Sequence, residues 1–486
     1  MMSPEQNTIQ FILDDQIVTI DFEKQGLSPT LTVLNYLRSL ATHKGVKEGC
    51  AEGDCGACTV IIAEVGNNQL KYKAINSCLV FLPMLHGKQL ITVENLAVKK
   101  ANEIKLHPVQ QAMVDLNGSQ CGYCTPGIVM TMFSLYKNHQ SPDREIIEDA
   151  LTGNLCRCTG YQPIIKAAEK ACGNGNKDHF SENEKDTILL LNQIKKGSIS
   201  IETSSQKYFQ PTTIKGAFDH IETHPDASII NGSTDIALKQ TKQFQVLEEL
   251  IDFSNIEELK QFEESEIEIT IGSGLSLESI QAKIGDQLPA FSNLLNVFAS
   301  KQIREVATLG GNIGTASPIG DTIPLLTAYN SRLKLVSRSN ERIISIEEFI
   351  TGYRKTDLQK GEIIHSIIIP KPENQMIQFY KVSKRKDLDI STVSAGFRLE
   401  LVNNKVTDIC LAYGGMAEIP KKASATENYL LNKDWTFENI NKATKILKDE
   451  FNPISDARAG VEFRKTAAKN LLIKFYEETK QVYAST

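Results

Sequence analysis

The chain has 486 residues, of which 41% are hydrophobic and 23% are charged, and its formal net charge is −6. A chain of this length is too long for one ordinary hydrophobic core and predicts about three or four domains. The negative charge argues against a nucleic-acid role, which would need a clustered basic face. No apolar run approaches the roughly 20 residues of a membrane span, and the N-terminus resembles no secretory signal. We therefore expect a cytoplasmic protein with no nucleic-acid or membrane partner.

The N-terminal part of the chain predicts a small mixed domain rich in β-structure. Apolar and polar residues alternate at 9–22 around an Asp14-Asp15 turn, which predicts a hairpin. Further elements follow along the chain: a helix at 30–40, a second hairpin at 59–65 and 70–75, and a closing strand at 89–96. A cysteine-rich loop falls at one edge of this domain.

From about residue 103 to 172 the pattern changes to helices. Thr125 and Pro126 predict the N-cap and first residue of one helix. Asp143 and the Gln162-Pro163 pair predict the starts of two more.

The middle of the chain predicts an interdomain linker. Residues 173–206 are polar, with one short apolar patch that predicts a small docking helix. Strands and helices alternate over 208–375, with a loop-rich stretch at 299–321. Two amphipathic helices, at about 436–450 and 457–480, end the last segment, and their apolar stripes predict core packing.

Eight of the ten cysteines fall into two sets of four. The first set is Cys50, Cys55, Cys58 and Cys78, and its spacing is that of plant-type [2Fe–2S] ferredoxins. Gly49, Gly53 and Gly56, next to and between these cysteines, let the backbone turn so that amide N–H groups face the sulfurs. The alternative is a structural zinc site with four cysteine ligands, although such sites usually have two Cys-x2–4-Cys knuckles.

The second set is Cys121 and Cys124, followed after 31 residues by Cys156 and Cys158. The first pair lies just before a predicted helix, and the second pair lies in the loop between two others. A Cys-x-Cys pair is cramped for tetrahedral zinc, so the set favours a second iron–sulfur cluster. We expect the remaining cysteines, Cys172 and Cys410, to be ordinary semi-buried thiols.

The sequence does not support a histidine metal site, a Walker A nucleotide site or a Rossmann dinucleotide site. His220 and His224 are spaced i,i+4 but lack a supporting carboxylate, which predicts a solvated helix face. There is no Walker A sequence, and Gly272-Ser-Gly274 is followed by Leu277 where a Rossmann fingerprint has its third glycine. A Rossmann dinucleotide site is therefore not predicted.

Two other glycine-rich segments could hold phosphate groups. Residues 230–238 place Gly, Ser and Thr after a strand, where backbone amides can form an anion nest. Residues 307–321 combine an adjacent glycine pair with polar side chains. Thr308, Asn312, Thr315 and Ser317 are candidate donors there, and Asp321 is a candidate acceptor from a sugar hydroxyl. The alternative for both segments is a pair of surface turns.

The chain resembles the molybdenum hydroxylase family, and within it the N-terminal half of the xanthine dehydrogenases. The cysteine motifs EGDCGACTV, QCGYCTPGIVM and GNLCRCTGYQPI carry the resemblance. The segments NGSTDIAL, SKQIREVATLGGNIGTASPIGD and KRKDLDISTVSAGFRL extend it to that family's FAD domain and to the segment after it. The resemblance covers the chain from about residue 7 to 480.

The resemblance implies a multidomain α+β fold with a fixed order of domains. These are a β-grasp ferredoxin-like domain, an all-helical [2Fe–2S] domain, an α+β FAD-binding domain and an α+β C-terminal flavoprotein domain like that of CO dehydrogenase. We expect the boundaries to be 7–96, 97–175, a linker at 176–206, 207–375 and 376–482. Electrons are expected to pass from a molybdopterin centre through the helical-domain cluster and the ferredoxin-like cluster to FAD, and then to NAD, during purine oxidation.

The resemblance also implies which residues bind FAD. One segment would wrap the FAD diphosphate: Ile230, Asn231, Gly232, Ser233, Thr234, Asp235 and Ile236. Phe298 would pack near the isoalloxazine ring, and Lys381 lies where family members contact the flavin. Further FAD contacts are expected from Thr308, Asn312, Thr315 and Asp321. The charged loop Lys384–Asp389 would set the electrostatics beside the flavin and hence NAD access.

The chain departs from the family's usual pattern in two ways. Asn231, Ser233 and Asp235 are mild changes in the flavin loop that leave FAD binding expected. No residues remain for a molybdenum domain, so a large molybdopterin-binding partner subunit is expected, in a heterodimer or a dimer of heterodimers. An aldehyde or other azaheterocycle hydroxylase, an oxygen-using oxidase and a non-enzymatic iron–sulfur protein stay open as alternatives.

Overall fold

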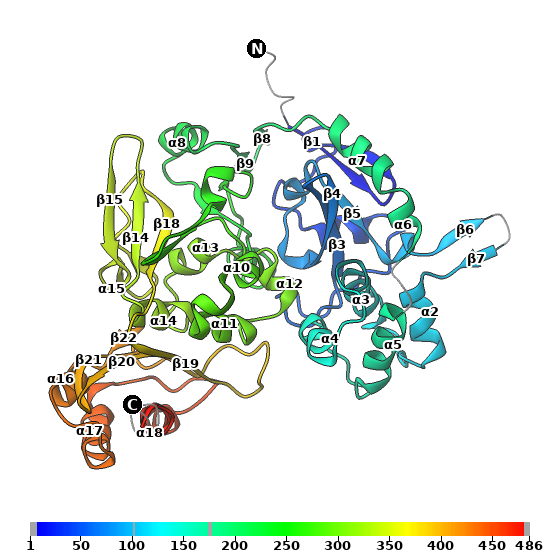
Figure 1. Ribbon diagram of the computed structural model, residues 1–486. Helices are drawn as coiled ribbons and strands as arrows, with labels where there is room; N and C mark the ends of the chain where they lie inside the picture. Colours follow the sequence, from blue (N-terminus) through cyan, green and yellow to red (C-terminus); the bar gives the residue numbers. More distant parts are fainter. Residues whose placement is uncertain (1–6, 101–102, 174–176, 481–486) are drawn as a thin grey trace. The chain divides into compact units, whose positions relative to one another are not determined.

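The computed structural model describes residues 7–100, 103–173 and 177–480. The chain is divided into two compact units (Figure 1). The first contains Met1–Ile256 and Ala299–Ala307, and the second contains Glu257–Phe298 and Thr308–Thr486. Among the described residues, no helix is both long enough and apolar enough to cross a membrane.

The first unit begins with a five-stranded sheet in the order β2-β1-β5-β3-β4. Its strands are β1 (Thr8–Leu13), β2 (Gln16–Asp21), β3 (Thr59–Gly66), β4 (Gln69–Asn76) and β5 (Gln89–Ile91). β1 and β2 form one antiparallel hairpin, β3 and β4 form another, and β1 runs parallel to β5. Helix α1 (Val33–Ser39) buries Val33, Leu34 and Leu37 in the same core. This arrangement is the predicted β-grasp.

The closing strand is shorter than predicted. It ends at Ile91, because the main-chain N–H and the hydroxyl of Thr92 both donate to Asp14 Oδ1 at 3.1 Å. The chain then turns through a short 3-10 helix at Val93–Asn95. The Asp14 carboxylate, next to the hairpin turn, therefore replaces a strand partner.

Four helices form the next part of the first unit. They are α2 (Pro108–Asp115), α3 (Thr125–Asn138), α4 (Arg144–Leu151) and α5 (Gln162–Cys172), preceded by an unpredicted hairpin of β6 (Val98–Lys100) and β7 (Glu103–Lys105). Asp143 caps α4 as predicted. The prediction of Thr125 as an N-cap is wrong: Cys124 is the N-cap, and the Thr125 hydroxyl lies 2.7 Å from the Ser119 hydroxyl instead.

The segment between this helical part and the next sheet carries two helices, α6 (His179–Glu182) and α7 (Glu184–Gln193). Leu191 and Ile194 are buried in the hydrophobic core that the four helices share with β3 and β4. The predicted docking helix is therefore present, and its apolar side chains close this core.

The rest of the first unit is a four-stranded sheet in the order β10-β11-β9-β8. The strands are β8 (Ile199–Glu202), β9 (Lys207–Gln210), β10 (Ser228–Ile230) and β11 (Glu249–Asp252), with helices α8 (Ile214–Thr223), α9 (Ala237–Thr241) and α12 (Lys301–Arg304). The parallel strand β10 ends at the glycine-rich segment that begins with Asn231. The prediction of a solvated helix face at His220 and His224 is wrong. Both rings lie against Phe209, and their centroids are 4.4 and 4.5 Å from that of Phe209.

The second unit contains a five-stranded sheet in the order β12-β13-β18-β14-β15. Its strands are β12 (Phe262–Glu264), β13 (Glu268–Gly272), β14 (Arg332–Val336), β15 (Glu341–Ser345) and β18 (Ile363–Pro370). Helices accompany it: α10 (Leu277–Ile284), α11 (Pro289–Asn296), α13 (Leu309–Gly314), α14 (Thr322–Ala328) and α15 (Ile346–Phe349), with the small hairpin β16 (Ile350–Gly352) and β17 (Lys355–Thr356). The stretch predicted as loop-rich is partly helical, because Thr308 caps α13 by accepting from Gly311 N–H.

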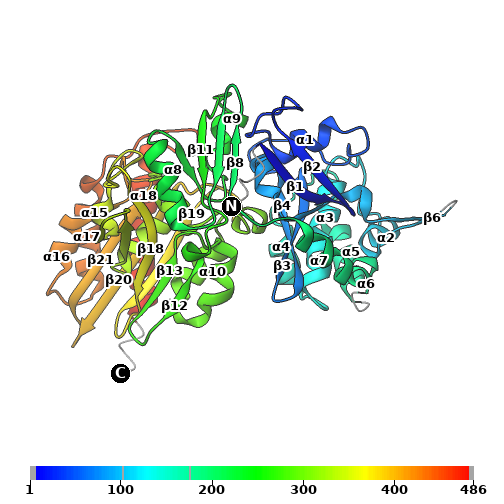
Figure 2. The same cartoon turned by 90° about the horizontal axis from the view of Figure 1, so that it is seen from above.

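The second unit ends in a sheet of order β19-β20-β21-β22. The strands are β19 (Met376–Val382), β20 (Val393–Val402), β21 (Lys405–Gly414) and β22 (Lys421–Lys422), followed by α16 (Ser424–Leu430), α17 (Phe437–Glu450) and α18 (Val461–Thr479). Figures 1 and 2 show α17 and α18 beside this sheet. Buried residues of the two helices, among them Leu447 and Phe475, share one core with it. The predicted core role of the two helices is confirmed, and so is the multidomain α+β fold class.

A buried ionic cluster fastens α6 to the helical part. Asp178 caps α6, and its carboxylate lies 3.0 Å from His107 Nε2 and 2.9 Å from Lys137 Nζ. Although burial acts in the opposite direction, the hydrogen bonds from His107 and Lys137 hold the pKa of Asp178 well below its usual range. The ionised carboxylate therefore stabilises the folded state at neutral pH.

We predict that Asp178→Asn costs about 3 kcal/mol of stability near neutral pH, because it leaves Lys137 buried without its charge partner. Urea unfolding monitored by circular dichroism measures the shift in midpoint. The native carboxylate's contribution is fully present above about pH 4, the unfolded-state pKa, and is lost as pH falls towards the lowered folded-state pKa. The gap between wild type and variant should therefore close in acid.

Asp115→Asn is the matched control, because the exposed Asp115 pairs with Lys170 in the same helical part. Exposed pairs contribute about 0–1 kcal/mol. Equal midpoint shifts for the two variants would show that the buried cluster does not stabilise the helical part as described.

Candidate iron–sulfur and flavin sites

The first cysteine set lies on two loops of the β-grasp. Cys50, Cys55 and Cys58 lie between α1 and β3, and Cys78 lies in a 3-10 turn directly after β4. Cys58 and Cys78 are buried, with their sulfurs 3.4 Å apart, and Cys50 forms a side-chain hydrogen bond with Cys55. The structure thus brings all four residues together as two pairs of thiols.

Main-chain amides surround the Cys50 sulfur. The N–H groups of Glu52 and Cys55 donate to Cys50 Sγ at 3.4 and 3.3 Å. The Cys55 thiol and these amides lower the pKa of Cys50 to about 5, against the effect of burial. Positive φ angles at Ala51 and Gly53, of 56° and 83°, turn the loop so that the amides face inward. A thiolate, the form that binds metal, is therefore favoured at Cys50.

The second cysteine set joins two loops of the helical part. Cys121 and Cys124 precede α3, and Cys156 and Cys158 lie between α4 and α5, as predicted. Side-chain hydrogen bonds pair Cys124 with Cys156 and Cys158 with Cys121. Cys121 and Cys158 are exposed, so this set lies at the surface of the unit.

The pairing of the thiols tests whether the sets fit their predicted cofactors. Among the described residues, no group of three or more His, Cys, Asp or Glu side chains could hold a single metal ion. Each cysteine set is instead two pairs of sulfurs, and a two-iron cluster takes two thiolates on each iron. Both donor sets therefore fit a [2Fe–2S] cluster.

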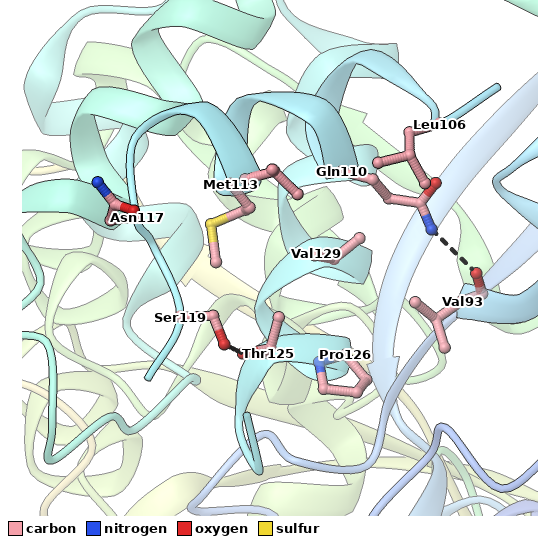
Figure 3. Close-up of a pocket in the computed structure, with 10 residues that line it drawn as sticks. Val93, Leu106, Gln110, Met113, Asn117, Ser119, Thr125, Pro126 and Val129 are labelled. Carbon is pink, nitrogen blue, oxygen red and sulfur yellow. Dashed lines mark hydrogen bonds between the residues drawn. The ribbon is translucent and has the colours of Figure 1, made fainter. Parts of the chain in front are cut away.

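A pocket of about 310 Å³ is lined in part by Ser119 and Thr125, which flank Cys121 and Cys124 in the chain (Figure 3). Its lining is mostly apolar and carries no charge: Val93, Leu106, Gln110, Met113, Val114, Asn117, Ser119, Thr125, Pro126 and Val129. The Gln110 amide donates to Val93 O at 3.3 Å and so ties α2 to the β-grasp. The pocket brings no reactive group to the cysteines.

The glycine-rich segment after β10 has the close backbone approach expected of an anion nest. Gly232 has a φ of 85°, and a Cβ there would lie 1.9 Å from Val306 O. Ser233 is buried, and its hydroxyl donates to Leu79 O at 2.5 Å, so it serves the fold beside Cys78. The amides of this segment, and not the Ser233 hydroxyl, are therefore left as candidate phosphate donors.

Several predicted FAD residues of the second unit also hold the fold. The Thr308 hydroxyl caps α13, and the Thr315 hydroxyl donates to Gly311 O at 2.9 Å. Asn312 Oδ1 accepts from the Thr322 hydroxyl at 2.6 Å. Gly310 packs closely against Ser273, since a Cβ on Gly310 would lie 2.5 Å from Ser273 Cβ and 2.7 Å from Ser273 O.

Asp321 and Lys381 form a buried pair with one acceptor left over. Asp321 Oδ2 lies 3.2 Å from Lys381 Nζ, which also donates to Val297 O at 2.9 Å, next to Phe298. Asp321 Oδ1 is buried and has no hydrogen-bond partner within the described part of the chain. A buried carboxylate oxygen without a partner is costly, so this atom fits the predicted hydroxyl of FAD.

The charged loop predicted beside the flavin is folded on itself. Arg385 pairs with Asp389, and Lys384 donates to Ala457 O at 3.1 Å. The predicted FAD residues thus divide between the two units. The segment Ile230–Ile236 lies in the first unit, and Phe298, Thr308, Asn312, Thr315, Asp321 and Lys381 lie in the second.

The residues that join the two cysteine loops were not predicted from the sequence. Leu155 N–H donates to Cys55 O at 3.0 Å, and Asn154 Nδ2 donates to Gly56 O at 3.1 Å. Gly56 has a φ of 67°, and a Cβ there would lie 2.0 Å from Gly153 O. The adjacent GN in GNLCRC was a possible signal, because it directly precedes the second cysteine pair.

We predict that Gly56→Ala forces the two cysteine loops apart and lowers the iron content of the purified chain. Gly87→Ala is the matched control, because Gly87 has a similar φ of 73° and the added Cβ would have no atom of the residues that the structure describes within 4 Å. Both variants carry the strain of a left-handed residue, roughly 1–2 kcal/mol, but only Gly56→Ala adds the clash. Equal iron content in the two variants would contradict this account of the loop contact.

Three segments of the chain match known protein families. Residues 92–169 match a family described as a [2Fe-2S] binding domain. Residues 201–372 match the FAD binding domain in molybdopterin dehydrogenase, and residues 378–479 match the CO dehydrogenase flavoprotein C-terminal domain. The chain therefore carries iron–sulfur and FAD-binding domains in the predicted order.

Two solved structures show the same fold over part of the chain. Cu,Mo-CO dehydrogenase, in a cyanide-inactivated form, gives a TM-score of 0.52 at 22% identity and covers 56% of this chain and 96% of that chain. Quinoline 2-oxidoreductase from Pseudomonas putida 86 gives 0.53 at 21% identity and covers 58% and 98%. At these identities the likeness concerns the fold alone.

Curated relatives match along nearly the whole chain. The xanthine dehydrogenase of Emericella nidulans is 32% identical over 97% of this chain and 38% of its own length. The xanthine dehydrogenase/oxidase of Mus musculus is 32% identical over 93% and 38%. The chain thus spans about two fifths of the length of these relatives. With its domains and relatives together, the chain belongs to the molybdenum hydroxylase family as an iron–sulfur and FAD-binding member.

Proposed function

We propose that the chain is the electron-transfer subunit of a xanthine dehydrogenase. It takes electrons from a molybdopterin centre on a partner chain and passes them through two [2Fe–2S] clusters to FAD and then to NAD. The observation that carries this proposal is the pair of four-cysteine sets, each arranged as two thiol pairs, on one chain with an FAD-binding domain. Similarity to xanthine dehydrogenases over 97% of the chain supports it.

The two cysteine sets have different proposed places in the electron path. Cys121, Cys124, Cys156 and Cys158 hold the cluster that receives electrons, since this set includes the exposed thiols. Cys50, Cys55, Cys58 and Cys78 hold the cluster that leads to FAD. When bound, the clusters supply one-electron transfer, and FAD joins it to the two-electron chemistry of NAD. The residues themselves bind the irons, exclude water and stabilise thiolate charge with amide N–H groups.

The residues proposed to bind FAD are those that the resemblance implies. Main-chain amides of Ile230–Ile236 bind the diphosphate, and Asp321 Oδ1 accepts from a hydroxyl of FAD. Lys381 holds the Asp321 carboxylate in place and, with Phe298, lies near the isoalloxazine ring. The remaining FAD contacts are Thr308, Asn312 and Thr315. The loop Lys384–Asp389 sets the charge where NAD approaches.

The substrate centre is proposed to lie on a large molybdopterin-binding partner, in a heterodimer or dimer of heterodimers. The domains of this chain, proposed at 7–96, 97–175, 207–375 and 376–482, are devoted to iron–sulfur clusters and flavin. Hypoxanthine and xanthine are the proposed substrates, NAD the acceptor, and the cytoplasm the location. Copurification with a molybdopterin-bearing chain, followed by assays with xanthine and NAD, tests this assignment. Activity only with aldehydes, with other azaheterocycles or with oxygen as the acceptor would overturn it.

The cofactor content of the wild-type chain tests the proposal independently of substrate. Metal analysis and visible absorbance should give about four irons and flavin per chain. Zinc in place of iron, without flavin, would contradict the proposed function.

We predict that Cys156→Ser removes the helical-domain cluster while FAD stays bound. Iron should fall from about four to about two per chain, because a [2Fe–2S] cluster needs all four of its thiolates. Cys172→Ser is the control, since Cys172 is a buried thiol of the same helical part outside both sets. If Cys156→Ser keeps all its iron, or if Cys172→Ser loses as much, the proposed ligand set is wrong.

We predict that Asp321→Ala weakens FAD binding roughly tenfold or more, since a hydrogen bond to a charged group contributes about 1.5–3 kcal/mol. Flavin fluorescence, titrated into chain stripped of FAD, measures the dissociation constant. Asp408→Ala is the control, because Asp408 pairs with the buried Arg398 of the same unit at 2.6 Å. Equal affinities of the two variants for FAD would rule out Asp321 as the acceptor.

A further inference from the structure

The two cysteine loops are joined by a main-chain hydrogen bond. Leu155 N–H donates to the carbonyl oxygen of Cys55 at 3.0 Å. Leu155 directly precedes Cys156 in the chain. A path from the sulfur of Cys156 to the sulfur of Cys55 therefore follows covalent bonds except at this one hydrogen bond.

Two glycines allow backbones to approach closely around that hydrogen bond, and a third makes room for the side chain of Gln302. A Cβ on Gly56 would lie 2.0 Å from Gly153 O, and a Cβ on Gly127 would lie 2.1 Å from Gly56 O. A Cβ on Gly153 would lie 2.0 Å from Gln302 Oε1. The backbones are thus closer than any other residue type allows, and a small shift of either loop would break the contact.

Asn154 holds the loop of the second cysteine set against the first. Its side chain is buried, and Nδ2 donates to Gly56 O at 3.1 Å and lies 3.3 Å from Thr59 Oγ1. Its Oδ1 accepts from the Thr131 hydroxyl at 2.6 Å. Because Leu155 directly follows Asn154, these hydrogen bonds of the Asn154 side chain hold the main chain in place at Leu155.

Gln302 fixes Asn154 in turn. The side chain of Gln302 is fully buried, and its Nε2 donates to Asn154 Oδ1 and Thr131 Oγ1, both at 3.0 Å. It also lies 3.2 Å from Ala150 O at the end of α4. The amide group of Gln302 therefore contacts α3, α4 and the loop of the second cysteine set, and holds them together.

The helix that carries Gln302 is itself anchored to the helical part. Ser300 caps α12, and Arg304 Nη2 lies 2.7 and 3.0 Å from the two carboxylate oxygens of Asp149 in α4. Arg304 is buried. The position of Gln302 is thus set by a salt bridge to the same α4 whose last turn it contacts.

We propose that Gln302 is a positioning residue for electron transfer between the two iron–sulfur sites. It touches neither cysteine set, and it acts by holding Asn154, and through it the hydrogen bond from Leu155 to Cys55. In the step it serves, one electron leaves the site of Cys156, which is oxidised, and enters the site of Cys55, which is reduced. No covalent bond or proton changes place. This inference rests on the proposed function.

Gln302→Met tests the role, because methionine keeps the length and volume of the side chain and removes its amide. Gln206→Met is the matched control. Gln206 is also a buried glutamine of the first unit, and its Nε2 donates to Thr30 Oγ1 at 3.0 Å and Leu247 O at 2.8 Å, away from both cysteine loops. Each holoprotein is checked for iron, flavin and urea midpoint, so that a loss of stability is measured separately from electron transfer.

Two spectroscopic measurements then test whether Gln302 positions the two iron–sulfur sites for electron transfer. Electron paramagnetic resonance of the dithionite-reduced protein reports the spin–spin interaction of the two clusters, and pulse radiolysis reports the rate at which an electron moves between them. We expect Gln302→Met to keep about four irons and to lose part of the spin–spin splitting. Transfer should slow roughly tenfold, as small misplacements of reacting groups do. Gln206→Met should match wild type in both readouts.

An unchanged rate and splitting in Gln302→Met would overturn the inference, as would equal changes in Gln206→Met. If Gln302→Met does not hold iron, Thr131→Val is the second test. It removes the hydroxyl that donates to Asn154, and the inference then requires slower electron transfer in this variant. An unaltered Thr131→Val would then overturn the inference. Absence of two clusters in wild type is a different result, because it would contradict the proposed function itself.

Discussion

The close packing of two cysteine loops is the constraint on which the rest of this chain depends. A main-chain hydrogen bond from Leu155 to Cys55 joins the loops, and Gly56 leaves no room for a side chain against the carbonyl oxygen of Gly153. The β-grasp supplies one loop and the helical part supplies the other. Because one-electron transfer needs closely held centres and no moving parts, rigid packing serves the function better than a flexible hinge.

The two sites differ in burial, and the difference fits their proposed places in the path. Cys58 and Cys78 are buried within the β-grasp, whereas Cys121 and Cys158 are exposed on the helical part. An exposed site can meet a centre on another chain, while a buried one is shielded from solvent and from unwanted acceptors. In the second unit, Asp321 keeps a buried oxygen that has no hydrogen-bond partner among the described residues, which is costly unless a ligand satisfies it.

Local patterns predicted most elements of the fold. The hairpins at β1–β2 and β3–β4 and the N-cap at Asp143 depend on neighbouring residues, so the sequence displays them directly. The closing strand was predicted too long, because the donor–acceptor pair that ends it joins Thr92 to Asp14, far apart in the chain. The helix α13 was missed, because its three glycines usually mark a loop, whereas the structure shows that Thr308 caps its start.

The candidate site was predictable where chemistry requires unusual residues at fixed spacing, as with the eight cysteines. Residues that position the site were not predictable, because Asn154 and Gln302 are common polar residues whose partners come from distant segments. The same holds for Ser233, which was expected to face a ligand but bonds to Leu79 O. Their roles come from tertiary contacts that no local pattern records.

The number of electrons that the wild-type chain accepts tests the central claim most directly. Anaerobic titration with dithionite, monitored by visible absorbance, counts the reducing equivalents per chain. Two [2Fe–2S] clusters and one FAD predict about four electrons, one for each cluster and two for the flavin. An uptake of about two electrons or fewer would contradict the account, because either the clusters or the flavin would then be missing from the path.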